Sequence, residues 1–335
     1  MYEGGRSGGE TPRRVRPEAW EPQVESAILR RTVAAIGRIL VTLGLLTLMF
    51  VAYELWGTGF VTARAQTHLK HEFQQQLEQV HASPVVKIPA KPSTGRPAST
   101  VVNPRLLIAP PEGQPVGEIT IKKIDVDWAI VEGVQLPDLA KGPGHYPGTP
   151  LPGQIGNAAI AGHRTTHGAP FFRVNELAPG DKIVIKTLAG TYTYVVYKTP
   201  FAVQPTDYGV VANTPDAELT LTSCEPRYSA AQRIIVKAKL VRNLSSKPNR
   251  PPKRINGKAV KAPPSKALAT GLQGESNSDI PAALWGIVVF AVGMLWWWAF
   301  RRWRHPLTWA LGVIPFLIVL LPFYFYLERA LPNGY

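Results

Sequence analysis

The chain has 335 residues, a formal net charge of +14 and a single cysteine. This length accommodates one large domain or two ordinary ones, and a single cysteine excludes an intrachain disulfide framework. Basic residues are concentrated in residues 243–279, which are also rich in Pro, Ser and Gly. That composition predicts a disordered basic linker rather than a folded nucleic-acid module. We therefore expect no nucleic acid among the partners.

Three apolar stretches are long enough to cross a bilayer as helices, which takes about 20 residues. The first covers residues 32–56, with Arg38 close enough to the interface to reach it with its long side chain. The others cover residues 280–300 and 306–327. We therefore predict three transmembrane helices and a multi-pass protein of the cell membrane in contact with lipid.

The distribution of arginine predicts the orientation in the membrane. The tail 1–31 and the tight loop 301–305 are rich in arginine, which places both in the cytoplasm. The long middle region and the tail 328–335 then lie outside the cell. A competing interpretation is signal-peptidase cleavage after Ala63-Arg64-Ala65. The length of the apolar run, and the distance from it to this motif, favour an uncleaved signal anchor.

Residues 57–115 have no pattern of a compact domain. Apolar residues between Ala65 and Val80 recur at helical spacing and predict a short amphipathic stalk helix. Such a helix is either a plain spacer, which we favour, or lies on the membrane surface. Prolines are frequent from Ser83 to Pro115 and predict a stiff, extended linker.

Residues 116–242 have the pattern of one mostly β domain. The apolar alternation and turn residues predict short strands at Glu118–Lys122, Val126–Val131, Asn157–His163, Asp181–Thr187, Thr191–Lys198, Glu218–Cys224 and Arg233–Val241. The first two pair as a hairpin, and the fourth and fifth flank a tight turn. A short helix is expected at Phe171–Leu177. Many short strands at regular spacing predict a closed barrel or a sandwich.

Cys224 ends one of these strands, in the run TLTSC (Thr220–Cys224). A lone cysteine is either a small buried hydrophobe or a free thiol kept for its chemistry. If Leu219 and Leu221 face the core, strand alternation turns Cys224 away from it. The same alternation turns Arg233 away from the core, so we expect both side chains on a surface. With His163 at the end of an upstream strand, they provide a thiol, an imidazole and a guanidinium, which suit acyl transfer.

These residues together resemble the sortases, cysteine transpeptidases of Gram-positive cell surfaces. The resemblance rests on TLTSC, on the arginine that opens the next strand, and on NAAIAGHR upstream. GHYPGTPLPGQIGN (144–157) and GAPFFRVNEL (168–177) are most similar to class E sortases. Two departures are Ser223, where the family usually has threonine, and the C-terminal pair of spans. The resemblance implies a closed eight-stranded β-barrel with short helices.

The resemblance also implies a mechanism and partners. Cys224 would be the nucleophile, His163 the general acid/base, and Arg233 the residue that stabilises the oxyanion or the substrate. The substrate would be a surface protein with an LAxTG-like or LPxTG-like sorting signal, cleaved between Thr and Gly through a thioacyl-enzyme. An amine of the lipid-linked peptidoglycan precursor would accept the protein. The catalytic domain would face the cell wall.

Other candidate residues lie outside this catalytic set. Tyr146, by resemblance, helps to select alanine at the second position of the motif. Thr222 and Ser223 either hydrogen-bond the substrate backbone or satisfy the sheet. Arg227 is an alternative to Arg233. His167 follows His163 at a spacing known from metal sites, but no third ligand is evident, and we expect no metal or cofactor.

Three alternatives differ from this interpretation. In L,D-transpeptidases the histidine and cysteine lie close together in one motif, whereas His163 and Cys224 are far apart. Pilin-polymerising sortases often have an Asp-Pro-aromatic lid ahead of the domain, which this sequence lacks. A non-catalytic surface scaffold would not need a cysteine, a histidine and an arginine in this order. Only an activity measurement separates that last alternative from an enzyme.

Overall fold

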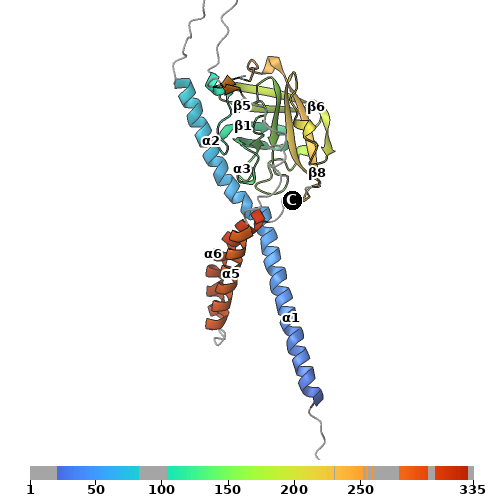
Figure 1. Ribbon diagram of the computed structural model, residues 1–335, viewed down its shortest axis with the longest axis vertical. Coiled ribbons are helices and arrows are strands. Elements are labelled where there is room, and N and C mark those ends of the chain that lie inside the picture. The colour runs from blue at the N-terminus through green and yellow to red at the C-terminus, as the bar shows by residue number, and fades with distance from the viewer. Residues whose placement is uncertain are drawn as a thin grey trace, which may run out of the picture. The chain divides into compact units, whose positions relative to one another are not determined.

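The computed structural model of the chain describes residues 21–82, 104–229, 231–251, 254–255, 258–259, 279–300 and 306–330 (Figure 1). The expectations for residues 1–20, for most of the proline-rich and basic linkers, for the loop 301–305 and for the tail 331–335 lie outside the described residues.

An eight-stranded closed barrel forms the centre of the domain, as the resemblance implied (Figure 1). Its strands are β1 (Pro115–Ile121), β2 (Val126–Glu132), β3 (Gly144–His145), β4 (Gly156–Ala161), β5 (Lys182–Thr187), β6 (Gly190–Val203), β7 (Ala217–Glu225) and β8 (Gln232–Leu240). Around the barrel they follow the order β1-β2-β3-β4-β7-β8-β6-β5. The β2–β3 and β4–β7 pairs are parallel, and the other pairs are antiparallel. The expected β1–β2 and β5–β6 hairpins are confirmed.

Strand alternation produces the barrel core. On β7 and β8 the residues expected to face inward do so: Leu219 and Leu221 lie in the core cluster with Ile234, Val236 and Ala238. Burying leucine, isoleucine and valine side chains such as these stabilises the fold by roughly 1.5–3 kcal/mol each. The alternate residues of β7 and β8 therefore face outward, where other segments of the chain cover them.

The segment 171–177 differs from the expected helix. It contains only a 3-10 helix, η4 (Val174–Glu176). Phe171, Val174 and Leu177 are all buried, and their spacing of three residues matches the three-residue turn of a 3-10 helix. The two-residue strand β3 was not predicted, because so short a strand in a loop rich in Gly and Pro leaves no alternation to detect.

Several short elements complete the described region. They are the 3-10 helices η2 (Pro104–Leu107), η3 (Lys122–Ile124), η5 (Tyr208–Val211) and η6 (Arg242–Leu244), the helix α3 (Leu136–Leu139), and the hairpin β9 (Arg254–Ile255) and β10 (Lys258–Ala259). The disorder expected from residue 243 does not hold for residues 243–249. The N–H of Thr191 donates to Ser246 Oγ at 3.1 Å, and the N–H of Ile155 donates to the Asn249 carbonyl at 2.7 Å. These bonds attach the segment to the barrel, so the folded domain extends past residue 242.

Helix α2 (Thr58–Ala82) is part of the domain. It follows α1 (Glu21–Ala52) and a π-helical segment, η1 (Tyr53–Gly57). Leu69 and Phe73 are buried on its barrel side. The Gln66 side chain donates to the carbonyls of Ala129 (3.0 Å) and Lys141 (2.8 Å) and accepts from the Ala129 N–H (2.7 Å). The stalk interpretation was therefore wrong, because the apolar stripe of this helix faces the barrel rather than solvent or lipid.

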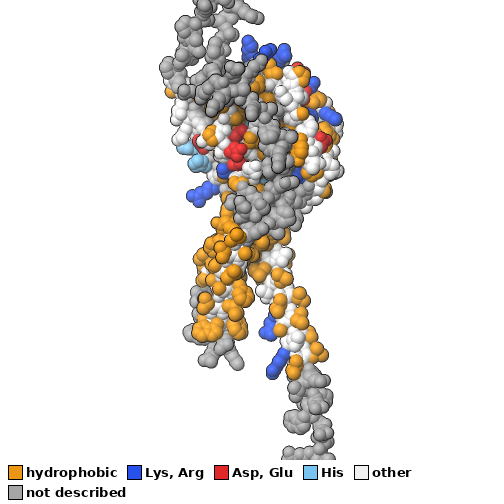
Figure 2. Space-filling model, in the orientation of Figure 1, with side chains coloured by type: hydrophobic (Ala, Val, Ile, Leu, Met, Phe, Trp, Pro, Cys, Tyr) orange, Lys and Arg blue, Asp and Glu red, His pale blue; other side chains and the backbone are white. Residues whose placement is uncertain are grey.

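The described residues contain two helices long and apolar enough to cross a membrane, not the three predicted. One is Ile28–Ala82, which begins within α1 and continues through η1 and α2, and the other is Ile280–Ala299 in α5 (Asp279–Phe300). The third stretch forms the helix α6 (Pro306–Ala330), which contains two prolines, but its described apolar part is only Ile314–Leu327. That part is shorter than the roughly 20 residues that a span needs. Figure 2 shows hydrophobic side chains on the surfaces of α1, α5 and α6.

These helices also correct the expected fold class. The barrel itself is β, but the four long helices together contain more residues than the strands. The chain as a whole is therefore not mostly β. The prediction overestimated the share of strand in the chain because it was based mainly on residues 116–242, where the strand pattern is clearest.

Candidate active site

The parallel pairing of β4 and β7 brings a histidine beside the cysteine. Ala161 pairs with Thr222 at the end of the ladder, and the Gly162 N–H donates to the Thr222 carbonyl at 3.0 Å. In a parallel pair the two chains run in the same direction. His163, two residues past Ala161, therefore emerges at the level of Cys224, two residues past Thr222.

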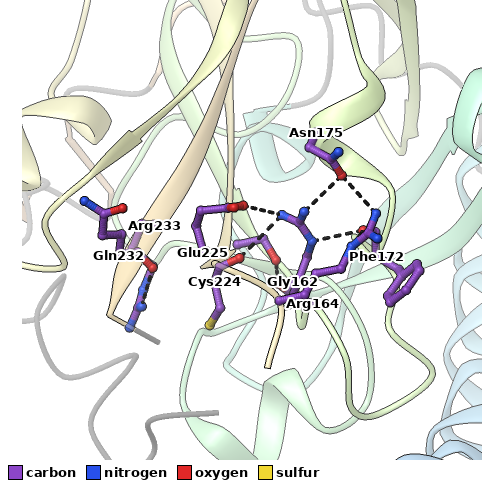
Figure 3. Close-up of polar contacts among 10 residues, drawn as sticks. Gly162, Arg164, Phe172, Asn175, Cys224, Glu225, Gln232 and Arg233 are labelled. Carbon is purple, nitrogen blue, oxygen red and sulfur yellow. Dashed lines mark hydrogen bonds and ion pairs between the residues drawn. The ribbon is translucent and has the colours of Figure 1, made fainter. Parts of the chain in front are cut away.

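The antiparallel pairing of β7 and β8 brings an arginine opposite the same cysteine. Cys224 and Arg233 are direct partners in the ladder. Figure 3 shows the two side chains extending to the same side of their strands. One guanidinium nitrogen of Arg233 donates to the Gln232 carbonyl at 2.9 Å. Three strand ends thus bring together the three residues that the sequence selected.

Cys224 and Arg233 are covered rather than exposed. They face away from the barrel core, as alternation predicted, but only 8% and 6% of their surfaces are exposed. The expectation that they lie on a surface was therefore wrong. Alternation identifies which side of the sheet a residue faces, but the loops on that side decide whether solvent reaches it.

This burial determines the resting protonation of the pair. Burial raises the pKa of the Cys224 thiol above its ordinary 9.0, and the neighbouring Arg233 and Arg164 lower it in part. Burial also lowers the pKa of the His163 imidazole well below 6.5, and the nearby His167 adds to that effect. Both directions favour the neutral forms. The resting pair near pH 7 is therefore a thiol beside a neutral imidazole.

The backbone around His163 is tightly held. Its carbonyl accepts a hydrogen bond from the Phe171 N–H at 3.1 Å. The Phe171 ring packs on Gly162, where an added Cβ would lie 2.5 Å from a ring carbon. Only glycine permits that approach. Among the described residues, His163 Nε2 is buried and has no hydrogen-bond partner, while Nδ1 lies 3.4 Å from the Thr166 hydroxyl. Such a nitrogen is available to a substrate.

Arg164 is a site residue that the sequence reasoning missed. Only 3% of its surface is exposed, and its guanidinium links two segments (Figure 3). It donates to the Phe172 carbonyl (2.9 Å) and the Asn175 side chain (2.9 Å) on one side. On the other side it contacts the Glu225 carboxylate (3.2 Å) and the Cys224 carbonyl (3.4 Å). Arg164 therefore connects the end of β7 to the loop after His163. In the sequence, the feature that pointed to this role was its position directly after His163.

Arg227, the alternative to Arg233, belongs to this second cluster. It is half-buried, and its guanidinium lies over the Phe172 ring, 4.2 Å from the ring centroid. It also donates to the Asn175 side chain at 3.2 Å. The register places Arg233, not Arg227, opposite Cys224.

A pocket on the outer face of β7 is lined in part by Arg233, the ladder partner of Cys224. Its lining includes Tyr146, Tyr208, Val211, Thr222, Arg233 and Ile235. The Tyr146 and Thr222 hydroxyls are hydrogen-bonded at 2.9 Å, and burial raises the pKa of Tyr146. Ser223 lies on the other face of the strand, where its hydroxyl donates to the Gly162 carbonyl at 2.7 Å. The structure thus brings Tyr146 and Thr222 to the pocket but not Ser223.

A buried histidine supports the loop that carries Tyr146. His145 Nδ1 lies 2.7 Å from the Glu132 carboxylate, and Nε2 lies 3.1 Å from the Pro150 carbonyl. Both nitrogens face acceptors, so both donate and the ring is an imidazolium. Burial opposes this charge, but the Glu132 carboxylate outweighs it and raises the pKa of His145 above 6.5. The Thr149 hydroxyl joins the network at 3.0 Å from Nε2 and donates to the Tyr146 carbonyl at 2.8 Å.

Replacing His145 with glutamine should destabilise the domain in a pH-dependent way. Breaking a buried ion pair costs about 3–5 kcal/mol. Because the folded-state pKa is raised, the stabilisation is complete below pH 6.5 and is lost as pH rises through the folded pKa. Thermal unfolding of the two proteins, measured from about pH 6 to pH 9, should show a gap that narrows with rising pH. The exposed His71 in α2, changed to glutamine, is the control. A gap independent of pH would contradict the imidazolium assignment.

Comparison with known proteins identifies the family. A sortase domain matches residues 119–241. Sortase SrtE1 of Streptomyces coelicolor is 32% identical over 222 residues, covering 62% of this chain and 56% of SrtE1. Sortase D of Bacillus subtilis is 35% identical over 117 residues, covering 35% of this chain and 58% of that protein. The crystal structure of Streptomyces coelicolor sortase E1 with a tripeptide in the active site is 30% identical, with 43% of this chain and 96% of that chain covered and a TM-score of 0.37.

Residues 119–241 of the chain form a sortase domain, and sortases are a family of cysteine transpeptidases. Its relatives include class E sortases, as the sequence motifs indicated. The chain matches 56% of the length of SrtE1 and 58% of that of Sortase D. The matched region coincides with the barrel, which contains Cys224, His163 and Arg233.

Proposed function

We propose that this chain is a membrane-anchored, class E-like sortase that transfers surface proteins to the cell wall. The observation that carries the proposal is the convergence of three strand ends: β4 leads to His163, β7 to Cys224 and β8 to Arg233. A thiol, an imidazole and a guanidinium at one place suit acyl transfer to and from sulfur. The related sortase E1, whose structure has a tripeptide in the active site, supports a peptide substrate for the same region.

Cys224 and His163 share one proton through the first half of the reaction. His163 takes the thiol proton, and the thiolate attacks the carbonyl carbon between Thr and Gly of the sorting signal. Arg233 stabilises the resulting oxyanion with its fixed donors. The C–N bond then breaks, and the imidazolium of His163 gives its proton to the departing glycine amine. A thioester on Cys224 remains.

The second half reverses these roles. An amine of the cell-wall precursor attacks the thioester carbonyl while His163 accepts a proton from that amine. The C–S bond breaks, the new amide leaves, and the proton of His163 returns to the Cys224 sulfur. Because the resting pair is neutral, only a small fraction of enzyme has the thiolate and imidazolium together at a given moment. Substrate binding, which expels water, therefore matters for the rate.

The pocket beside Arg233, which pairs with Cys224, is the proposed binding site for the sorting signal. Tyr146 and Thr222 line it, and their hydrogen bond forms one wall. A buried tyrosine narrows a pocket and favours a small side chain, which supports alanine at the second position of an LAxTG-like signal over the proline of LPxTG. The partners are then surface proteins with such a signal and the lipid-linked peptidoglycan precursor.

The apolar helices support an anchor in the cell membrane. Ile28–Ala82 is near the N-terminus and Ile280–Ala299 is near the C-terminus of the described region. The arginine-rich flanks place the N-terminal tail and the loop 301–305 in the cytoplasm. The barrel then lies outside, facing the wall, and the protein crosses the membrane more than once.

Peptide transfer tests the function directly. Full-length protein in detergent is incubated with an LAxTG peptide or an LPxTG peptide, with and without a glycine-type or diaminopimelate-type amine. Mass spectrometry should detect a thioacyl adduct on Cys224 and a new peptide–amine product, with LAxTG the better substrate. No adduct and no product from either peptide would leave a non-catalytic scaffold as the better reading. Transfer to a pilin lysine peptide in preference to the wall-type amines would favour a pilin-polymerising enzyme.

A further inference from the structure

A second histidine, His167, lies against the proposed acid/base. The ring centroids of His163 and His167 are 4.7 Å apart, and the ring planes are inclined by 40°. His167 is buried. Its backbone φ of 52° lies in the left-handed region, which residues with a Cβ adopt at a cost. The surrounding structure therefore holds this residue in place against the preference of its own backbone.

Two threonines of α2 contact His167. The His167 N–H donates to the Thr58 hydroxyl at 3.1 Å. The ring Nδ1 lies 3.5 Å from the Thr62 hydroxyl, at the long end of hydrogen bonding. Both threonines are fully buried, with 1% and 0% of their surfaces exposed. Buried polar side chains are generally hydrogen-bonded. Here one of the partners is the His167 N–H, which belongs to the loop beside His163.

The Thr62 hydroxyl assigns the tautomer of His167. It has a single hydrogen, which it donates to the Ala140 carbonyl (2.7 Å) or the Thr58 carbonyl (3.0 Å). Toward the imidazole its oxygen can then only accept, so His167 Nδ1 carries the hydrogen. The Nδ1–H edge of the His167 ring therefore faces α2, and its hydrogen bond to Thr62 determines how the ring is oriented.

We propose that His167 is a positioning residue that fixes the ring of His163, and that Thr58 and Thr62 anchor it to helix α2. This inference rests on the proposed function, because positioning His163 affects catalysis only if His163 is the general acid/base. His167 fills the space beside His163 and restricts its rotation, which protects the geometry needed for proton transfer. Since α2 follows the apolar helix α1 along the chain, the same N-terminal segment that provides the anchor also orders the active site.

Changing Thr62 to valine tests the anchor with little change in shape. The variant loses the hydroxyl that faces His167 Nδ1. We expect kcat to fall roughly 10-fold, since small misplacement of a catalytic group is costly. KM for the LAxTG peptide should stay unchanged, because Thr62 does not line the substrate pocket. Thr62→Ser keeps the hydroxyl and should restore kcat to near the wild-type value.

Two variants separate positioning from general loss of α2 packing. Thr67→Val removes the same kind of hydrogen bond, from the Thr67 hydroxyl to the Ala63 carbonyl at 3.0 Å, on the exposed face of α2. We expect this variant to leave kcat and KM unchanged. Gln66→Met removes three bonds between α2 and the barrel without touching His167. It should lower the melting temperature at least as much as Thr62→Val, yet leave kcat within about 3-fold of wild type.

A spectroscopic readout makes the test independent of turnover. With ¹³Cε1-labelled histidine, the His163 resonance is assigned from its loss in His163→Gln. We expect Thr62→Val to shift or broaden this resonance and Thr62→Ser to leave it unchanged. The inference is overturned if Thr62→Val matches Thr62→Ser in kcat and in the His163 resonance, or if Gln66→Met loses as much activity. If wild-type protein transfers no peptide, the proposed function fails, and the resonance alone still decides whether Thr62 positions His163.

Discussion

Replacing Cys224 with alanine is expected to abolish peptide transfer while leaving the fold intact. The thiol is the only one in the chain, so no other cysteine can form the thioacyl intermediate. Loss of a nucleophile typically costs roughly 10³-fold or more in kcat. The side chain lies outside the barrel core cluster, so its removal leaves no cavity among the core residues. Steady-state transfer, adduct detection by mass spectrometry and the melting temperature measure the three parts of this expectation.

Cys224→Ser is the matched control for shape and polarity. A serine hydroxyl is far less acidic than a thiol, and this site already raises the pKa of an acid by burial. The serine variant should therefore be as inactive as the alanine variant. Residual transfer by Cys224→Ala at more than about one hundredth of the wild-type rate would refute the assignment of the nucleophile.

Much of the barrel could be predicted from the sequence, because each long strand buries one face. The alternation in Leu219 and Leu221 and in Ile234 and Val236 identified the inward faces correctly. That same alternation identified the outward direction of Cys224. Turn residues predicted the two hairpins, but the pairing of strands that are distant in sequence could not be obtained in this way, since alternation is a local property. The parallel β4–β7 pair, which aligns His163 with Cys224, is a consequence of topology alone.

The parts of the candidate site that escaped prediction depend on contacts between distant segments. Burial of Cys224 depends on what covers β7, and strand alternation contains no information about it. Arg164 gains its role from Asn175 and Glu225, which approach it only in the folded barrel. An arginine directly after a histidine therefore carries little signal without the fold.

Helix α2 shows a different kind of limit. Its apolar stripe was recognised, but a stripe indicates only that one face is buried, not which surface buries it. Buried Thr58, Thr62 and Gln66 continue this face with polar residues, and these have no hydrophobic signature. Their partners are backbone groups of the barrel and the loop of His167. The sequence thus predicted the helix correctly, but it did not predict that the helix packs against the barrel.

Replacing Arg233 should have the second-largest effect, and the type of replacement should matter. Arg233→Gln removes the charge opposite Cys224, and removing one oxyanion donor typically lowers kcat by about 10²–10³-fold. Arg233→Lys keeps the charge but loses the planar fork of donors, so we expect a smaller loss, roughly 10-fold to 100-fold. Peptide KM and kcat measured separately distinguish transition-state stabilisation from peptide binding, because only the former lowers kcat at saturation.

The pKa of the Cys224 thiol provides a second test of the role of Arg233. Burial raises the pKa of Cys224, and Arg233 is the first of two arginines that lower it. Without that guanidinium the thiolate loses a stabilising charge, so Arg233→Gln should raise the pKa further above 9.0. The pH dependence of Cys224 alkylation measures this shift. A lower pKa in Arg233→Gln would have the wrong sign and would mean that Arg233 does not face the thiol in solution.

Arg227→Gln is the matched control, because Arg227 is the other arginine near the end of β7. Its guanidinium contacts the Phe172 ring and the Asn175 side chain rather than the reacting sulfur. We expect its loss to change kcat by only a few fold and the alkylation profile of Cys224 hardly at all. If Arg227→Gln instead lost more activity than Arg233→Gln, the oxyanion role would pass to Arg227. The β7–β8 register would then position a structural arginine, and the loop after β7 would have to move toward the Cys224 sulfur before the oxyanion forms.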